Sequence, residues 1–208
     1  MCLDKFLIKL RRTQPPGNCI NPWRGRAAAV KVRQANVALY LAEMAERNPT
    51  VLLVGEAPGY RGCGLTGVPF SSERILLEGA AGLFGANSSY QICDNKRAPI
   101  SEASATIVWQ ALARYPKQLP LIWNAFPFHP HRPGKVQSNR PPNVRELAMG
   151  AIFLQNLLKL FPSVSRVVAV GNRADDSLTR QGISHLKIRH PSHGGKRDFV
   201  AGLEEIFG

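Results

Sequence analysis

The sequence has few acidic residues and no long apolar run. Its 208 residues contain 14 Asp and Glu against 27 Lys and Arg, which gives a formal net charge of +13. This excess favours a polyanionic partner, and a basic protein without any nucleic-acid role is the alternative. No segment approaches the length of a membrane span, and the start, MCLDKFLIKLRR, is too short and too charged for a signal peptide. We therefore expect an intracellular protein that does not bind membranes.

The sequence also lacks the cysteine pairs of common metal and disulfide sites. Its four cysteines, Cys2, Cys19, Cys63 and Cys93, are scattered and form no C-x-x-C pair. A zinc site or a disulfide framework needs cysteines at short, regular spacings. An iron–sulfur cluster would have to gather all four from distant segments. We expect reduced thiols, no metal and no cofactor.

Apolar runs alternate with helical patterns along most of the chain. Strands are expected at 50–54, 119–124, 166–171 and 184–190. The first three lack polar alternation, as central parallel strands do, whereas the fourth alternates, as an edge strand does. Helices are expected at 26–48, 72–82, 101–115, 143–161, 173–181 and 196–207. This order predicts a three-layer α/β/α fold around a central, mainly parallel four-stranded sheet.

The length fits one domain, which we place at residues 26–208. Residues 1–25 mix basic residues with three prolines and two glycines, a composition typical of an arm or an irregular cover. Basic arms often lie along DNA, and we expect this of the segment. We expect the protein to be a monomer.

Residues 51–70, VLLVGEAPGYRGCGLTGVPF, contain a G-x-G-x-x-G pattern at Gly62, Gly64 and Gly67. A dinucleotide-binding site needs these glycines at the turn from a strand into a helix, where the helix N-terminus binds the pyrophosphate. Here the pattern begins eight residues beyond the strand and is followed by VPF. We favour a slot for a flat ring, in which glycines allow close backbone approach and Phe70 supplies an aromatic face.

Polar residues stand at the ends of the expected strands. Glu56 follows the first strand, Asn124 ends the second and His190 follows the fourth. Ligands of parallel α/β folds bind beyond these carboxyl ends. An amide offers a donor and an acceptor side by side, which matches the O4 and N3–H edge of uracil if its orientation is fixed. Taken singly, Asn124 also fits a turn residue, His190 a structural histidine and Phe70 a core residue.

Together, GEAPG, TGVPF, the asparagine at a strand end and HPS after the last strand resemble the uracil-DNA glycosylase superfamily, over roughly residues 50–200. GEAPG is similar to the first motif of the thermophile-type branch and TGVPF to the single-strand-selective monofunctional branch. HPS is similar to the catalytic and intercalation motif. The resemblance implies a base excision repair enzyme that flips a uracil out of damaged DNA, hydrolyses its N-glycosidic bond and leaves an abasic site.

The resemblance also implies residue roles. Phe70 would stack on the base, Asn124 would recognise its edge, and His190 would donate to O2 as negative charge develops there. Further substrate contacts are expected from Gly55, Ala57, Pro58, Gly59 and Tyr60. Contacts to the DNA are expected from Arg61, Arg132, Lys135, Arg140, Lys196 and Arg197, and from a wedge formed by Ser192, His193, Gly194 and Gly195.

Two positions depart from the family pattern. The best-known branch has an aspartate at the position of Ala57, where it positions the attacking water, and a tyrosine at Gly59, where it excludes the thymine methyl. We expect Glu56 to aid the water or the sugar cation, with a role as a loop anchor as the alternative. Gly59 predicts tolerance of some 5-substituted uracils. The cysteines do not match the iron–sulfur site of the thermophile-type branch.

Two other function classes stay open. A non-catalytic DNA- or damage-binding protein of the same fold is the first, because Ala57 replaces the aspartate that positions the water. A nucleotide-dependent enzyme is the second, and it would show no preference for DNA. No lysine is placed for lyase chemistry, so we expect a monofunctional glycosylase.

Overall fold

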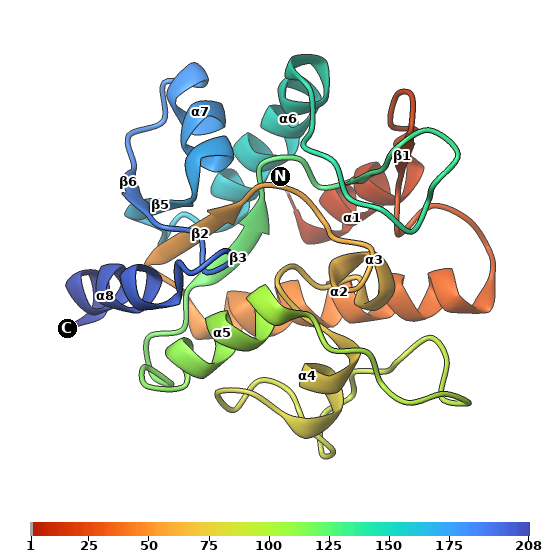
Figure 1. The fold of residues 1–208 in the computed structure, drawn as a ribbon, viewed down its shortest axis with the longest axis horizontal. Coiled ribbons are helices and arrows are strands. Elements are labelled where there is room, and N and C mark those ends of the chain that lie inside the picture. Colours follow the sequence, from red (N-terminus) through yellow and green to blue (C-terminus); the bar gives the residue numbers. More distant parts are fainter. Residues whose placement is uncertain (1) are drawn as a thin grey trace.

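A computed structural model describes residues 2–208 as a central sheet between layers of helices (Figure 1). The sheet contains four strands in the order β3-β2-β5-β6. Their bounds are β2 (Val51–Gly55), β3 (Leu121–Asn124), β5 (Arg166–Val170) and β6 (Leu186–Ile188). All three pairings are parallel. The predicted three-layer α/β/α fold with a mainly parallel four-stranded sheet is confirmed, and β6 lies at an edge as expected.

Each helical pattern of the sequence forms a helix. Several of these helices begin later or end earlier than the sequence predicts. The helices are α2 (Ala28–Arg47), α4 (Glu73–Glu78), α5 (Ala103–Leu112), α6 (Val144–Leu160), α7 (Asn172–Arg180) and α8 (Lys196–Phe207). In Figure 1, α6 and α7 lie on one side of the sheet, and α5 and α8 lie on the other. Within residues 2–208 no helix is both long enough and apolar enough to cross a membrane.

The beginning of the chain differs from the arm or irregular cover expected for residues 1–25. Helix α1 (Leu3–Arg12) buries Phe6, Leu7 and Leu10 in the same core that contains the central sheet. The composition was misleading because these apolar residues recur at helical spacing between basic ones, which gives one buried and one charged face. This segment is therefore part of the packed structure.

Two short elements were also not expected. Strand β1 (Cys19–Ile20) pairs antiparallel with β4 (His129–Pro130). Helix α3 (Cys63–Thr66) is a single turn inside the glycine run and ends at Gly67, whose φ is 78°. A Cβ on Gly67 would lie 2.9 Å from the Cα of Arg33 on α2. The glycine run is thus packed closely against α2.

Strand β3 lies at the second edge of the sheet, although its unbroken apolar run is typical of a central strand. The Tyr40 hydroxyl of α2 donates to the carbonyl oxygen of Ile122 at 3.3 Å and accepts from its amide nitrogen at 2.8 Å. Tyr40 thus pairs with both backbone groups that a further strand would have paired with. Burial raises the pKa of Tyr40 well above its usual value, so the hydroxyl stays protonated.

We predict that Tyr40→Phe lowers the free energy of unfolding by about 1–3 kcal/mol, because the buried amide and carbonyl of Ile122 lose their partner. Urea unfolding followed by circular dichroism measures this change. Tyr115→Phe is the control, because no described residue bonds its hydroxyl, and it should change stability by less than about 0.5 kcal/mol. Equal stabilities of the two variants would contradict the role of Tyr40.

Candidate active site

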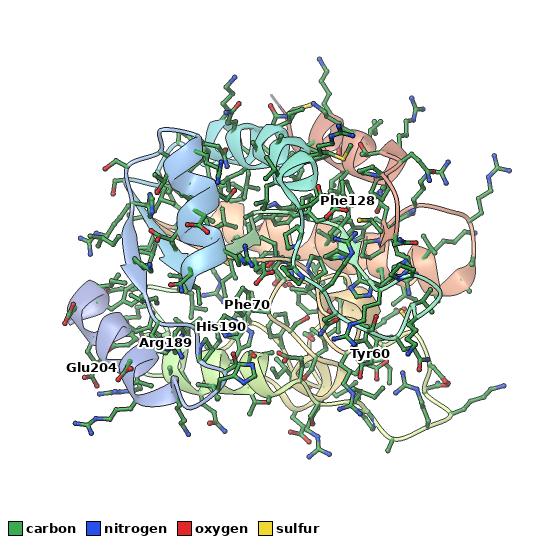
Figure 2. The ribbon with its side chains drawn as sticks, turned by 45° about the horizontal axis from the view of Figure 1, so that its top comes forward. Tyr60, Phe70, Phe128, Arg189, His190 and Glu204 are labelled. Atoms are coloured by element: carbon green, nitrogen blue, oxygen red, sulfur yellow. The ribbon has the colours of Figure 1, made fainter. Side chains whose placement is uncertain are left out.

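A cavity of about 330 Å³ opens beyond the carboxyl ends of the strands. Its wall contains most of the residues that the sequence singled out, namely Glu56, Ala57, Pro58, Gly59, Phe70, Asn124 and His190. The rings of Phe70 and His190 lie 6.4 Å apart between centroids. Figure 2 shows these two side chains together near the middle of the molecule, with Tyr60 at a distance from them. The fold therefore brings three separate segments of the sequence to one cavity.

The backbone and the ring of Phe70 are both held in place. Its φ of 47° is in the left-handed region, which a residue with a bulky side chain rarely adopts. Its carbonyl oxygen accepts from Nε1 of Trp109 at 2.7 Å. Its ring lies over Gly55, where any Cβ would overlap the ring. The position of the aromatic face thus depends on Gly55 having no side chain.

Asn124 ends β3 directly beside Gly55 of β2 and is only 4% exposed. Its side chain lines the cavity, and no residue from 2 to 208 bonds its amide. The amide atoms themselves are open to the cavity, because they are not among the fully buried side-chain atoms without a partner. Gly150 of α6 packs against the next residue, Ala125, so closely that a Cβ would overlap the Ala125 carbonyl. The backbone that carries Asn124 is therefore held in place, and its amide is free to bind a ligand.

The His190 ring has a defined tautomer. The backbone nitrogen of Ser192 donates to Nδ1 at 3.2 Å, and the Ser192 hydroxyl oxygen lies 2.7 Å from the same atom. Because Nδ1 accepts the backbone hydrogen, the neutral ring carries its own hydrogen on Nε2. Burial lowers the pKa of His190; Glu102 opposes this, and His193 and Arg189 add to it. His190 is thus a neutral donor at physiological pH.

Two glycines pack against His190. Gly171, after β5, has a φ of 86°, and a Cβ there would lie 3.0 Å from the His190 Cβ. Gly195 is the N-cap residue of α8, is buried, and lies so close to the His190 carbonyl oxygen that a Cβ would overlap it. We therefore assign Gly195 a packing role in place of the expected wedge. His193 and Gly194 are exposed.

Glu56 lines the cavity beside Ala57. Burial raises the pKa of Glu56, although Arg173 on α7 opposes this shift. No hydrogen bond from the described part of the chain reaches its carboxylate, so nothing there supports the alternative role as a loop anchor. The carboxylate is instead available to groups that enter the cavity.

The loop that carries Pro58 and Gly59 is tied to the segment between β4 and α6. Nδ1 of His129 lies 2.8 Å from the Pro58 carbonyl oxygen, and its Nε2 lies 3.1 Å from the Val136 carbonyl oxygen. The backbone nitrogen of Tyr60 donates to Oδ1 of Asn139 at 3.1 Å. The Tyr60 ring does not line the cavity with the other motif residues, and the Arg61 guanidinium lies 5.9 Å from its centroid.

Sequence reasoning missed several residues of the cavity wall, which are Ser71, Glu102, Ser104, Asn139 and Pro141. Glu102 caps α5, with its carboxylate accepting from the backbone nitrogens of Ser104 at 3.1 Å and Ala105 at 2.6 Å. Its place before a helix was predictable from the sequence. Its position across the cavity was not, because it follows from long-range packing.

The basic residues expected to bind DNA have different environments. Arg61, Arg132, Lys135, Lys196 and Arg197 are exposed. Arg140 instead bonds both carboxylate oxygens of Glu146, at 2.7 and 2.8 Å, and its Nε donates to the His131 carbonyl at 2.9 Å. The Glu146 side chain is 2% exposed. We therefore assign Arg140 to a structural ion pair rather than to a phosphate contact.

The described residues contain no group of three His, Cys, Asp or Glu side chains that could hold a metal ion. Cys2, Cys19, Cys63 and Cys93 are free thiols. Burial raises the pKa of Cys63 far above its usual value, so this thiol stays protonated.

Comparisons with known proteins bear on the family and on the fold. The profile of the family described as Uracil DNA glycosylase superfamily matches residues 42–201. No curated protein matches the chain. The fold is similar to the crystal structure of wild-type SMUG2 of Pedobacter heparinus, with a TM-score of 0.64 and 16% identity over 98% of this chain and 95% of that chain. Because the family profile covers most of the sequence, including the loop after β2, Asn124 and His190, the chain belongs to the uracil-DNA glycosylase superfamily.

Proposed function

We propose that the protein is a monofunctional uracil-DNA glycosylase, which hydrolyses the N-glycosidic bond of a flipped-out uracil and leaves an abasic site. One observation carries this proposal: an unpartnered, buried amide and a neutral histidine donor lie around one aromatic ring in a single cavity. These groups are Asn124, His190 and Phe70. The enzyme acts as a monomer and uses no metal or cofactor.

The cavity has the groups needed to bind a uracil. Stacking on the Phe70 ring contributes about 1–3 kcal/mol to the binding of a base, whichever base it is. Base identity comes from Asn124, whose amide donates to O4 and accepts from N3–H. Cytosine presents the reverse pattern and would need the amide to flip.

The chemistry depends on groups that interact more strongly with the transition state than with the ground state. As the glycosidic bond lengthens, the sugar becomes cationic and the base becomes an anion with charge on O2. A hydrogen on Nε2 of His190 stabilises this oxygen, and the lowered pKa keeps the donor neutral. The free carboxylate of Glu56 stabilises the sugar cation or orients the attacking water.

Flipping the base costs a few kcal/mol, which binding to the rest of the DNA must offset. The exposed His193 and Gly194 form the wedge that enters the gap. Gly59 leaves open space beside the base, so some 5-substituted uracils fit. Phosphates are bound by the exposed side chains of Arg61, Arg132, Lys135, Lys196 and Arg197.

A second candidate is a DNA- or damage-binding protein of the same fold without turnover. The identity of Ala57 favours this candidate. Its side chain has no polar atom, and it lines the cavity where a water-positioning aspartate is expected. Both candidates bind phosphates, so salt dependence does not separate them. Only cleavage of the glycosidic bond does.

We predict that Asn124→Ala and His190→Ala each slow uracil excision by about 10²-fold or more, because each removes a group that binds the leaving base. The measurement is single-turnover cleavage of an oligonucleotide with one uracil, revealed by alkali. His185→Ala is the control and should retain the wild-type rate, because this histidine bonds Asp175 outside the cavity. Wild-type protein that binds the oligonucleotide and leaves it intact after alkali would support the second candidate.

We also predict a pH dependence from Glu56. Its raised pKa means that the ionised carboxylate is lost as pH falls through a value above 4.5, so the excision rate should fall there. His190 has a pKa below 6.5 and adds no loss near neutral pH. Glu56→Gln should be slow at every pH and lack the acidic fall, whereas Glu46→Gln, at an exposed site, should keep the wild-type profile. Full activity of Glu56→Gln would remove Glu56 from the mechanism.

A further inference from the structure

One face of α5 meets the site at two points. Glu102 caps the helix and lies in the cavity wall, and Trp109 follows seven residues later, which returns it to the same face of the helix. Nε1 of Trp109 donates to the Phe70 carbonyl oxygen at 2.7 Å. No other hydrogen bond within residues 2–208 reaches the backbone of Phe70. The indole is therefore the sole hydrogen-bond partner of this backbone in the described part of the chain.

Phe70 adopts a backbone conformation that needs support from its surroundings. Its φ of 47° is unfavourable for an aromatic residue and persists only where neighbouring groups hold it. A change of φ at Phe70 would also turn its side chain, because the Cα–Cβ bond moves with the backbone. The ring would then leave its place over Gly55. The hydrogen bond from Trp109 thus bears directly on the direction of the aromatic face.

The Trp109 indole is itself held by a row of aromatic rings. It packs edge-on against Phe84, with ring centroids 4.9 Å apart, and Phe84 packs edge-on against Tyr90 at 4.8 Å. The Tyr90 hydroxyl donates to Oε2 of Glu43 on α2 at 2.7 Å. Trp109 is only 3% exposed. These contacts give the indole N–H one defined direction, toward Phe70.

We propose that Trp109 is a positioning residue for base excision, whose indole N–H holds the strained Phe70 backbone so that its ring faces the flipped base. The proposal rests on the proposed function, in which the base stacks on Phe70. Trp109 does not belong to the described wall of the cavity, so it acts through Phe70 and not on the base. A displaced ring holds the base less firmly as the glycosidic bond breaks, which slows excision.

The experiment compares Trp109→Phe, Phe70→Ala and the double variant. Trp109→Phe retains an aromatic ring and removes the donor. Single-turnover excision of uracil should slow about tenfold or more in this variant, because much of the stacking is lost. When Phe70 is already alanine, the same change should alter the rate by less than about twofold, because no ring is left to position. A residue that only supports the fold would slow excision equally in both backgrounds, which would overturn the proposal.

Tyr90→Phe is the matched control for a loss of stability. It also removes a buried hydrogen bond, the one to Glu43, and it retains every ring of the aromatic row. Both single variants should lower the midpoint of urea unfolding. Tyr90→Phe should excise uracil within about twofold of the wild-type rate. Equal slowing by the two variants, or a wild-type rate in Trp109→Phe, would refute the role of Trp109.

Hydrogen exchange tests the same bond in the unmodified protein, which covers the case that Trp109→Phe does not fold. In NMR spectra of the wild type, the indole hydrogen of Trp109 should exchange slowly, as a buried and bonded donor does. Rapid exchange would overturn the proposal. Wild-type protein that excises no uracil would instead refute the proposed function, and the exchange of this hydrogen would still report whether Trp109 holds Phe70.

Discussion

The absence of a side chain at Gly55 is the constraint on which the rest of the site depends. The Phe70 ring and the Asn124 oxygen both lie where a Cβ of this residue would project. The same kind of contact recurs at Gly150, against the segment after Asn124, and at Gly195, against the His190 loop. The cavity is therefore held by close contacts of glycine backbone with side chains and with other backbone groups, which leave few alternative positions. Such preorganised groups stabilise developing charge without reorganising during the reaction.

Charge is distributed differently on the surface and in the cavity. The net charge of +13 attracts a polyanion, and the five arginine and lysine residues expected to contact DNA are exposed. Inside the cavity, the amide of Asn124 and the imidazole of His190 are neutral, and Glu56 and Glu102 are carboxyl groups. This arrangement suits a reaction in which the leaving base becomes an anion and the sugar becomes a cation. In the proposed mechanism, donors at the base stabilise the first, and a carboxylate stabilises the second.

The sequence predicted what depends on local patterns and missed what depends on distant contacts. Apolar runs and their spacing were sufficient for the sheet, and strand ends were sufficient to bring Glu56, Asn124 and His190 together. Asn139 could not be predicted, because its bond to Tyr60 joins residues that are 79 positions apart. Arg140 could not be separated from the other basic residues, because its charge is the same whether it binds a phosphate or Glu146. Composition likewise concealed the packed helix at the start of the chain.

That first part of the chain supports the site directly. Nε1 of Trp23 donates to the carbonyl oxygen of Gly67 at 3.1 Å, and Nδ2 of Asn36 donates to that of Thr66 at 2.8 Å. These two bonds hold the glycine run that leads into Phe70, and Trp23 is 1% exposed. Both donors precede residue 42, where the match to the family profile begins. The recognisable motifs would thus supply the reacting groups, and a segment without such motifs fixes the position of the ring on which the base would stack.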